Sequence, residues 1–181
     1  MAQSSGEPKD TQPAMSNMQP LPTSGAITQP IQQAELILKL YELRREPVMR
    51  QARSFIGGPF SPCSADDLVA QVSAGNEQSA FILQVYGYWD MLSAFVLHGA
   101  LAESLVYDTC QEMYFQYSKI QPYLGAFREK MNLPEFLSSL EAVTEGSEAG
   151  RRRIRTMRQN ITRIAEIRAQ TTAGPSATVS D

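Results

Sequence analysis

Apolar residues recur along most of this chain at intervals of three and four positions, which is the spacing of one face of an α-helix. The first such run begins near Ile31 and meets Pro47, which lacks a backbone N–H and clashes with the preceding turn. The pattern predicts either one kinked helix or two helices that meet at Glu46–Pro47. A Gly-Gly-Pro sequence at positions 57–59 then ends the run.

Helix N-caps are expected at Ser64 and Asn76, because both side chains can accept a hydrogen bond from a backbone N–H of the first turn. The second cap precedes a segment, Ala80 to Ala102, that is apolar on nearly every side and carries Asp90 as its one formal charge. A helix of this kind belongs at the centre of a bundle. The alternative is a membrane span, which a central aspartate disfavours by about 2.5–3.5 kcal/mol and which no flanking cluster of Lys or Arg supports.

Three further helical stretches precede the C-terminal helix. They are predicted from about Ala102 to Ile120, from Pro122 to Phe127, and from Leu133-Pro134 to Gly146. The chain lacks the strict apolar–polar alternation with hairpin turns that is typical of β-strands. The predicted fold is therefore all-α, an irregular bundle of five to seven helices with a disordered N-terminal leader and an arginine-rich C-terminal helix.

Composition divides the chain into four parts. Residues 1–30 hold five prolines among Gln, Ser and Thr, and they bury too little apolar surface to offset their conformational entropy, so a disordered leader is expected. Residues 31–146 are predicted to form a helical core domain, 147–170 a basic amphipathic helix, and 171–181 a flexible tail. The leader lacks the layout of a secretion signal, so a cytoplasmic location is expected. The start of translation is open among Met1, Met15 and Met18.

The C-terminal helix combines an apolar seam with a strong positive charge. Its seam residues are spaced three, four and three apart, as in the a and d positions of a coiled coil: Ile154, Met157, Ile161 and Ile164. Seven arginines lie on the same helix, at positions 151, 152, 153, 155, 158, 163 and 168. Residues 147–181 consequently carry a net charge of +4 and residues 1–146 a charge of −7, which sum to the −3 of the whole chain.

Three interpretations of this helix stay open. Its seam can pack on the acidic core while the arginines are solvated, or it can bind a partner helix or a second copy of the chain. In the third interpretation the arginines bind a polyanion, although few aromatic residues accompany them to stack on bases, so nucleic acid is a disfavoured ligand. The residues expected to contact a protein partner or polyanion are Arg151, Arg152, Arg155, Arg158 and Arg163.

The inventory of reactive groups is sparse. Cys63 and Cys110 lie 47 residues apart, His98 is the only histidine, and the chain has no phosphate loop, dinucleotide motif or metal-ligand spacing. No catalytic, cofactor-binding or metal-binding residue is therefore assigned.

Asp90 requires a partner, because an unpaired buried carboxylate is costly. A buried ion pair with Arg44 or Arg45 is predicted, since both arginines lie on the first helix. An enzyme that uses Asp90 and His98 is a minor alternative, and it requires the two side chains to line one cavity.

The stretch YGYWDMLSAFVLHGAL, residues 86–101, resembles an uncharacterised bacterial family of helical proteins. In that family an aromatic–acid pair precedes an apolar turn, a glycine and an acidic residue that leads the next helix. The matching residues here are Trp89, Asp90, Gly99 and Glu103, with Pro122 and Arg128 at a later proline and arginine of the family. The resemblance covers about residues 80–130 and implies a helical fold without an activity. Many relatives carry membrane helices before this region, but residues 1–30 are too polar to span a bilayer, so membrane attachment is not implied.

The predicted function is that of a non-enzymatic protein-interaction or structural helical module. The alternative is a regulator that binds nucleic acid or another polyanion through the arginine-rich helix. Burial of the seam separates a packed helix from a binding one: packing requires Ile154 to Ile164 to be buried in the monomer, whereas partner binding requires an exposed apolar stripe.

Overall fold

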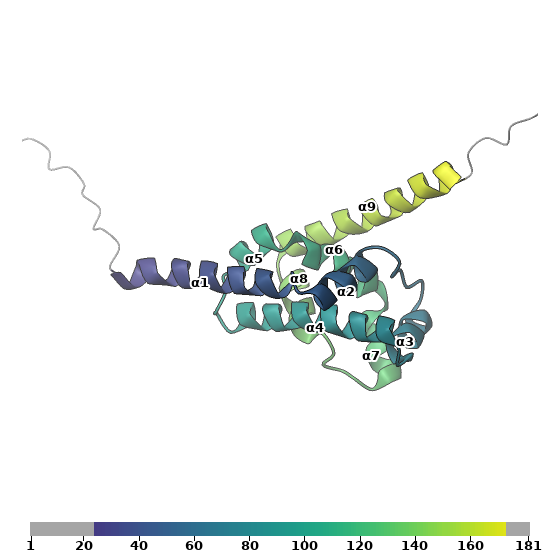
Figure 1. Ribbon diagram of the computed structural model, residues 1–181, viewed down its shortest axis with the longest axis horizontal. Helices are drawn as coiled ribbons and strands as arrows, with labels where there is room; N and C mark the ends of the chain where they lie inside the picture. Colours follow the sequence, from purple (N-terminus) through teal and green to yellow (C-terminus); the bar gives the residue numbers. More distant parts are fainter. Residues whose placement is uncertain (1–23, 173–181) are drawn as a thin grey trace, which may run out of the picture.

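A computed structural model describes residues 24–172 of the chain (Figure 1). These residues form helices and no strand, which confirms the all-α prediction, and the helices are more numerous than the five to seven predicted. In chain order they are α1 (Ser24–Leu43), α2 (Pro47–Gly57), α3 (Ala65–Ser73), α4 (Glu77–Leu97), α5 (Glu103–Thr109), α6 (Gln111–Ile120), the 3₁₀ helix η1 (Gln121–Tyr123), α7 (Leu124–Met131), α8 (Ser138–Gly146) and α9 (Glu148–Thr172).

The N-terminal region forms two helices rather than one kinked helix. α2 begins with Pro47 in its first turn, where a missing N–H breaks no helical hydrogen bond. α1 begins at Ser24, ahead of the predicted start near Ile31, so residues 24–30 of the predicted leader are helical. The rest of that leader, 1–23, lies outside the described residues, as does most of the predicted tail.

Both predicted N-caps are confirmed. Ser64 Oγ accepts a hydrogen bond from the N–H of Asp67 at 3.0 Å, and Asn76 Oδ1 accepts one from the N–H of Ser79 at 2.9 Å. The second cap starts α4, the helix predicted from the apolar segment. Gly99, with a φ of 73°, follows its end in the left-handed conformation that glycine adopts without strain.

The region after α4 is more interrupted than predicted. The helix expected from Ala102 to Ile120 breaks at Cys110, whose φ of −113° and ψ of 48° lie outside the helical region, and this break separates α5 from α6. Pro122 lies within the 3₁₀ helix η1, which starts at Gln121, and α7 begins only at Leu124 and continues beyond the predicted end at Phe127.

The helix predicted from Leu133 to Gly146 begins only at Ser138. Leu137 has a φ of 57° and therefore cannot belong to a right-handed helix. Residues 132–137 form a turn instead, and Arg128 holds this turn through a 2.9 Å hydrogen bond from Nε to the carbonyl oxygen of Phe136.

α4 lies in the body of the molecule, where it packs against α2, α3 and α8 (Figure 1). Val85, Tyr86 and Trp89 on its inner side are almost fully buried, but Leu83 and Met91 are exposed. By length and composition alone, α4 also meets the criteria for a membrane-spanning helix, and no other helix in the described part of the chain does. The neighbours therefore cover one side of α4 and leave the other side, with Leu83 and Met91, open.

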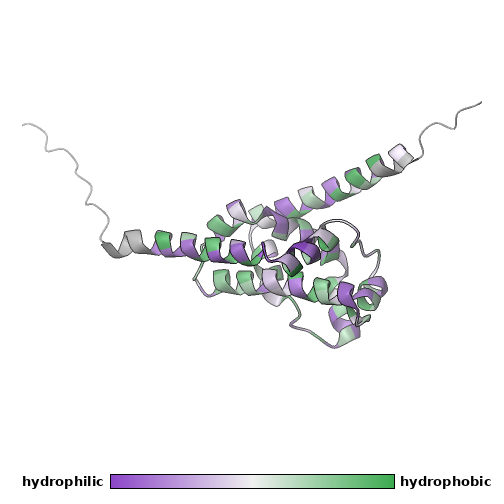
Figure 2. Ribbon diagram, in the orientation of Figure 1, coloured by the Kyte–Doolittle hydropathy of each residue, from purple (hydrophilic) through white to green (hydrophobic). Residues whose placement is uncertain are grey.

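Two helices reach beyond the body at opposite ends of the molecule. The start of α1 extends to the left in Figure 1, and the end of α9 extends to the upper right. The proximal part of α9 packs on α6 and α8. Beyond the body, apolar and polar residues alternate along α9 (Figure 2).

Gly150 permits the close approach of α9 to the end of α8. A Cβ at Gly150 would collide with the backbone carbonyl of Thr144, whereas a Cβ at Gly87, inside α4, would meet open space. The same substitution should therefore have opposite effects at the two sites. We expect Gly150→Ala to lower the free energy of unfolding by about 2 kcal/mol, because backbone must move, and Gly87→Ala to raise it by about 1 kcal/mol through helix propensity. Urea unfolding of both variants measures the effects. Changes of the same sign in the two free energies of unfolding would contradict this account of the contact between α8 and α9.

Candidate functional site

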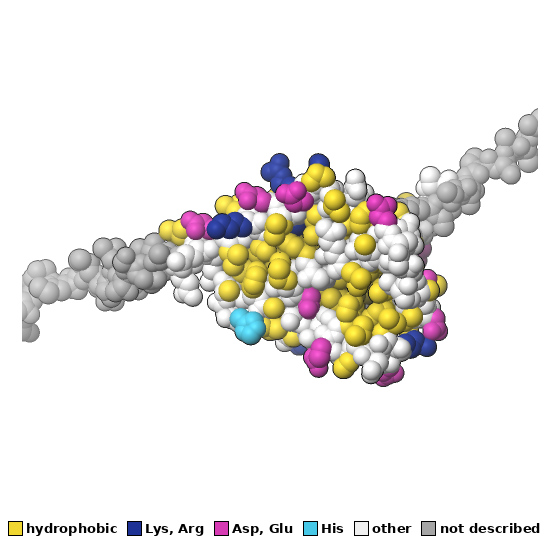
Figure 3. Space-filling view, turned by 60° about the horizontal axis from the view of Figure 1, so that its bottom comes forward, with side chains coloured by type: hydrophobic (Ala, Val, Ile, Leu, Met, Phe, Trp, Pro, Cys, Tyr) yellow, Lys and Arg dark blue, Asp and Glu magenta, His cyan; other side chains and the backbone are white. Residues whose placement is uncertain are grey.

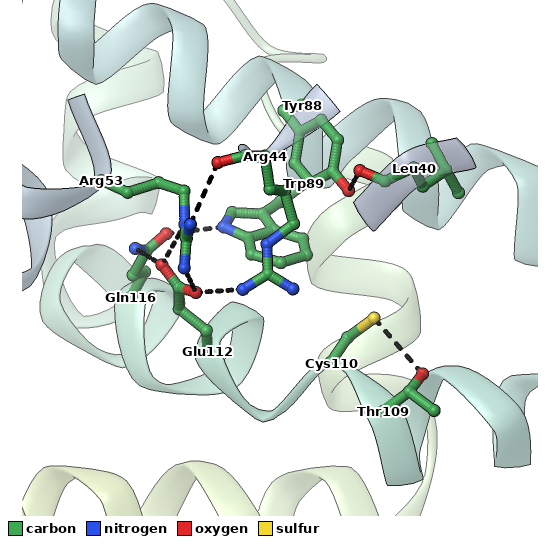
Figure 4. A network of polar contacts seen from close by, with 9 residues as sticks. All are labelled: Leu40, Arg44, Arg53, Tyr88, Trp89, Thr109, Cys110, Glu112 and Gln116. Atoms are coloured by element: carbon green, nitrogen blue, oxygen red, sulfur yellow. Dashed lines mark hydrogen bonds and ion pairs between the residues drawn. The ribbon is translucent and has the colours of Figure 1, made fainter. Parts of the chain in front are cut away.

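A buried ionic cluster joins the first two helices to α6 (Figure 4). Glu112, in the first turn of α6, pairs with Arg44 after the end of α1 and with Arg53 of α2. Arg53 Nε donates to Glu112 Oε1 at 2.8 Å, and Arg53 Nη1 donates to the carbonyl oxygen of Arg44 at 3.1 Å. The hydrogen bond that Arg53 donates to Glu112 raises the pKa of Arg53. One carboxylate thus neutralises one of two guanidinium groups and ties three segments together.

Two aromatic side chains of α4, Trp89 and Tyr88, border this cluster. The guanidinium of Arg44, whose side chain is 9% exposed, lies 5.0 Å from the centroid of the Trp89 ring. Trp89 Nε1 donates to Gln116 Oε1 at 2.6 Å, and Gln116 Nε2 donates to Glu112 Oε1 at 2.7 Å. Tyr88 OH donates to the carbonyl oxygen of Leu40 at 2.8 Å, and burial raises the pKa of Tyr88.

The cluster stabilises the fold and offers no group for catalysis. Its one carboxylate accepts hydrogen bonds from three side chains, those of Arg44, Arg53 and Gln116. The nearby thiol of Cys110 is less easily ionised than usual, because burial raises its pKa. Arg44 Nε has no hydrogen-bond partner, but it lies within the packed core. Within residues 24–172 there is also no group of three side chains suited to hold a metal ion.

The predicted ion pair of Asp90 with Arg44 or Arg45 is wrong. Asp90 Oδ1 accepts a hydrogen bond from the backbone N–H of Leu140 at 2.8 Å, while Arg44 pairs with Glu112. Leu140 is in the first turn of α8, and Leu137, which precedes that helix, has no side chain able to cap it. Asp90 therefore supplies the missing N-cap of α8 from another helix.

Asp90 also borders a shallow apolar groove of about 340 Å³ between α4 and the turn at residues 132–137. Leu83 and Gly87 line its α4 side. Figure 3 shows hydrophobic side chains gathered in two clusters on the side of the body that faces down in Figure 1. His98 is exposed at the C-terminal end of α4 and does not line this groove. Asp90 and His98 therefore do not form the shared cavity that an enzyme using both would need.

Several arginines of α9 make contacts within the molecule although their side chains are exposed. Arg151 and Arg155 pair with Glu148 at 3.4 and 3.1 Å, which holds the pKa of that carboxyl below its usual value. Arg158 Nη1 donates to Gln121 Oε1 at 3.2 Å. Arg152 and Arg163 are exposed. The five residues predicted to contact a partner thus share one helix and are all exposed, and three of them also make contacts within the molecule.

Arg153, which was not among those five, anchors α9 to the body. Its guanidinium carbon lies 3.3 Å from the centroid of the Tyr107 ring and 5.2 Å from that of Tyr114, and Nη1 donates to the carbonyl oxygen of Tyr107. These contacts explain why the proximal half of α9 is fixed on α5 and α6.

The seam of α9 changes from buried to exposed along its length. Ile154 is 5% exposed, Met157 and Ile161 are half-buried, and Ile164 is 44% exposed. Ile167, which the heptad pattern did not include, is 52% exposed. The seam is thus neither fully buried nor fully exposed, the two outcomes considered from the sequence. Its proximal part is packed on the body and its distal part is open.

α1 carries a second exposed apolar row. Its inner residues, including Leu40, pack on the core, whereas Ile31 and Leu38 on the opposite side are 54% and 64% exposed. Ala34 and Tyr41 complete this outer row at spacings of three and four, and both are exposed. The sequence does show this outer row, as apolar residues at heptad spacing, but spacing alone does not distinguish the buried row of α1 from the exposed one.

Comparison with protein families gives one match. The model of the domain of unknown function DUF4760 matches residues 30–147, which include α2 to α8, most of α1 and the whole of the ionic cluster. Neither the curated proteins nor the solved structures contain a match to the chain. The match bears out the resemblance to an uncharacterised family and carries no activity with it. Because the matched region is well over half of the chain, this protein belongs to the DUF4760 family of domains of unknown function.

Proposed function

We propose that this protein is a non-enzymatic interaction module in which the packed helices hold the distal part of α9 as a binding arm. The observation that carries the proposal is the gradient along the α9 seam, from Ile154 at 5% exposure to Ile164 at 44% and Ile167 at 52%. Exposed isoleucines in helical register on a projecting helix are costly in water and are typical of a helix that packs against a partner.

Binding of a polyanion is the second candidate, and the contacts of the arginines disfavour it. Arg151 and Arg155 are paired with Glu148, and Arg153 is stacked on Tyr107. The exposed charges of Arg152 and Arg163 support this candidate, but they flank an apolar seam that a phosphate backbone would leave uncovered. A protein helix covers the seam and can still supply acidic groups to the arginines.

Site-specific photo-crosslinking in the cells that produce the protein tests the proposal. A benzophenone amino acid at position 164 should give a discrete covalent adduct with a protein, because this position lies in the proposed contact. The same probe at Ala142, an exposed position of α8, is the matched control and should give none. Adding Ile167→Glu should remove the adduct at position 164.

Two outcomes would overturn the proposal. Equal adducts from positions 164 and 142 would mean that α9 has no preferred partner. An adduct that nuclease treatment removes would favour the polyanion candidate instead. In that case binding to a DNA duplex should weaken steeply with salt, since each phosphate contact releases about 0.9 counterion.

A further inference from the structure

We propose that the partner of the distal α9 seam is a second copy of this chain, and that the seam packs on the outer row of α1 of that copy. This inference rests on the proposed function and names its occupant. Both surfaces are apolar rows without cover, one on each projecting helix. Each row can therefore supply the apolar contact that the other row lacks in the monomer.

The two rows match in spacing. On α1, Ile31 and Leu38 are seven residues apart, with Ala34 and Tyr41 between and after them. On α9 the same alternation of three and four runs from Ile154 to Ile164, and Ile167 follows three residues later. Rows of this spacing interlock as knobs into holes when two helices lie side by side.

The charges beside the two rows are mainly opposite, with exposed Lys39, next to Leu38, as the one basic residue among those of α1. Glu35 and Glu42, both exposed, follow Ile31 and Leu38 by four residues and so lie beside the α1 row. Arg158 and Arg163 lie on either side of the distal α9 row, three residues before Ile161 and four before Ile167. Pairing of α9 with another α9 would instead bring arginines together, which opposes that arrangement. Charge therefore favours α1 as the partner.

In a two-fold symmetric dimer both contacts would form at once. In Figure 1, α1 and α9 leave the body at opposite ends, and both run from left to right. A two-fold rotation about an axis perpendicular to the plane of Figure 1 exchanges the two ends of the molecule and reverses the direction of each helix. The α9 of each copy then meets the α1 of the other in an antiparallel contact, and the resulting interface is closed and self-complementary, as is usual for homodimers.

Charge reversal on each helix tests the pairing in the full-length chain. The first variant is Glu35→Arg with Glu42→Arg, and the second is Arg158→Glu with Arg163→Glu. Sedimentation equilibrium should find the wild-type chain dimeric, and each variant alone should dimerise at least about tenfold more weakly, because like charges then face each other in both contacts. An equimolar mixture of the two variants should form heterodimers, because both contacts again join opposite charges.

The controls separate the pairing from its alternatives. Glu129→Arg on α7, an exposed charge reversal away from both rows, should leave the dimer unchanged, and circular dichroism should find all variants equally helical. Pairing of α9 with α9 predicts that the α1 variant dimerises normally, which would overturn the proposal. A wild-type chain that stays monomeric up to about 0.5 mM would overturn it as well. If that monomer still gives a protein adduct at position 164, the second copy is excluded while the proposed function stands.

Discussion

Replacing Glu112 by alanine should lower the free energy of unfolding by about 3 kcal/mol, because removal of one partner leaves a buried charge uncompensated. Arg44 is nearly buried and receives its ionic contact from this carboxylate. Gln116, fixed between Glu112 and Trp89, also loses an acceptor. Urea denaturation followed by circular dichroism measures the change as a lower midpoint at constant slope.

Two further variants separate the lost charge from the lost contact area. Glu129→Ala on α7, an exposed glutamate, should change stability by less than about 0.5 kcal/mol. The double variant Arg44→Met with Glu112→Leu should recover much of the loss, since a well-packed apolar pair is often as stable as a buried ion pair. A loss below about 1 kcal/mol for Glu112→Ala would mean that solvent screens the cluster, because the Glu112 side chain is 23% exposed.

Local sequence predicted the helices and their caps, because these depend on contacts within a few residues. Ser64 and Asn76 could be identified from residue type and position alone, whereas Pro47 marked the site of either a kink or a break without deciding between them. The late start of α8 could not be identified, because Leu137 adopts its left-handed conformation to fit a turn held by Arg128. No propensity assigns that conformation to leucine.

The partners of the buried polar side chains could not be predicted from local sequence patterns. Asp90 stood out as the one charge in an apolar helix, but its partner is a backbone N–H 50 residues away, and any residue type supplies such a donor. Arg44 and Glu112 are separated by 68 residues, and nothing near Glu112 marks it as the acceptor. A sequence shows that a buried charge needs a partner, and only the packing of the helices determines which one it gets.

The two exposed apolar rows illustrate the same limit in a different way. Helical spacing identified apolar positions on both α1 and α9 without showing which of them the body covers. The body covers Leu40 and Ile154 and leaves Leu38 and Ile164 open. Leu38 lies on the side of α1 opposite to Leu40, and Ile164 lies farther along α9 than Ile154, toward the end that projects from the body (Figure 1). The function proposed for this domain follows from this difference between residues buried by the body and residues left exposed on the same helix.

The same substitution at the two ends of the α9 seam should therefore give unequal results. Ile154→Ala should lower the free energy of unfolding by about 3 kcal/mol, because it removes three buried carbons and leaves a cavity. Ile164→Ala, measured in dilute monomer, should change it by less than about 0.5 kcal/mol, because the side chain is already in water and alanine favours the helix. Thermal and urea unfolding of both variants measure the difference. Equal losses would show that the whole seam is packed in the monomer, and no binding arm would then exist. A negligible effect at both positions would mean that α9 is not docked on the body at all, whereas the expected inequality assigns anchoring to the proximal half and leaves the distal half for a partner.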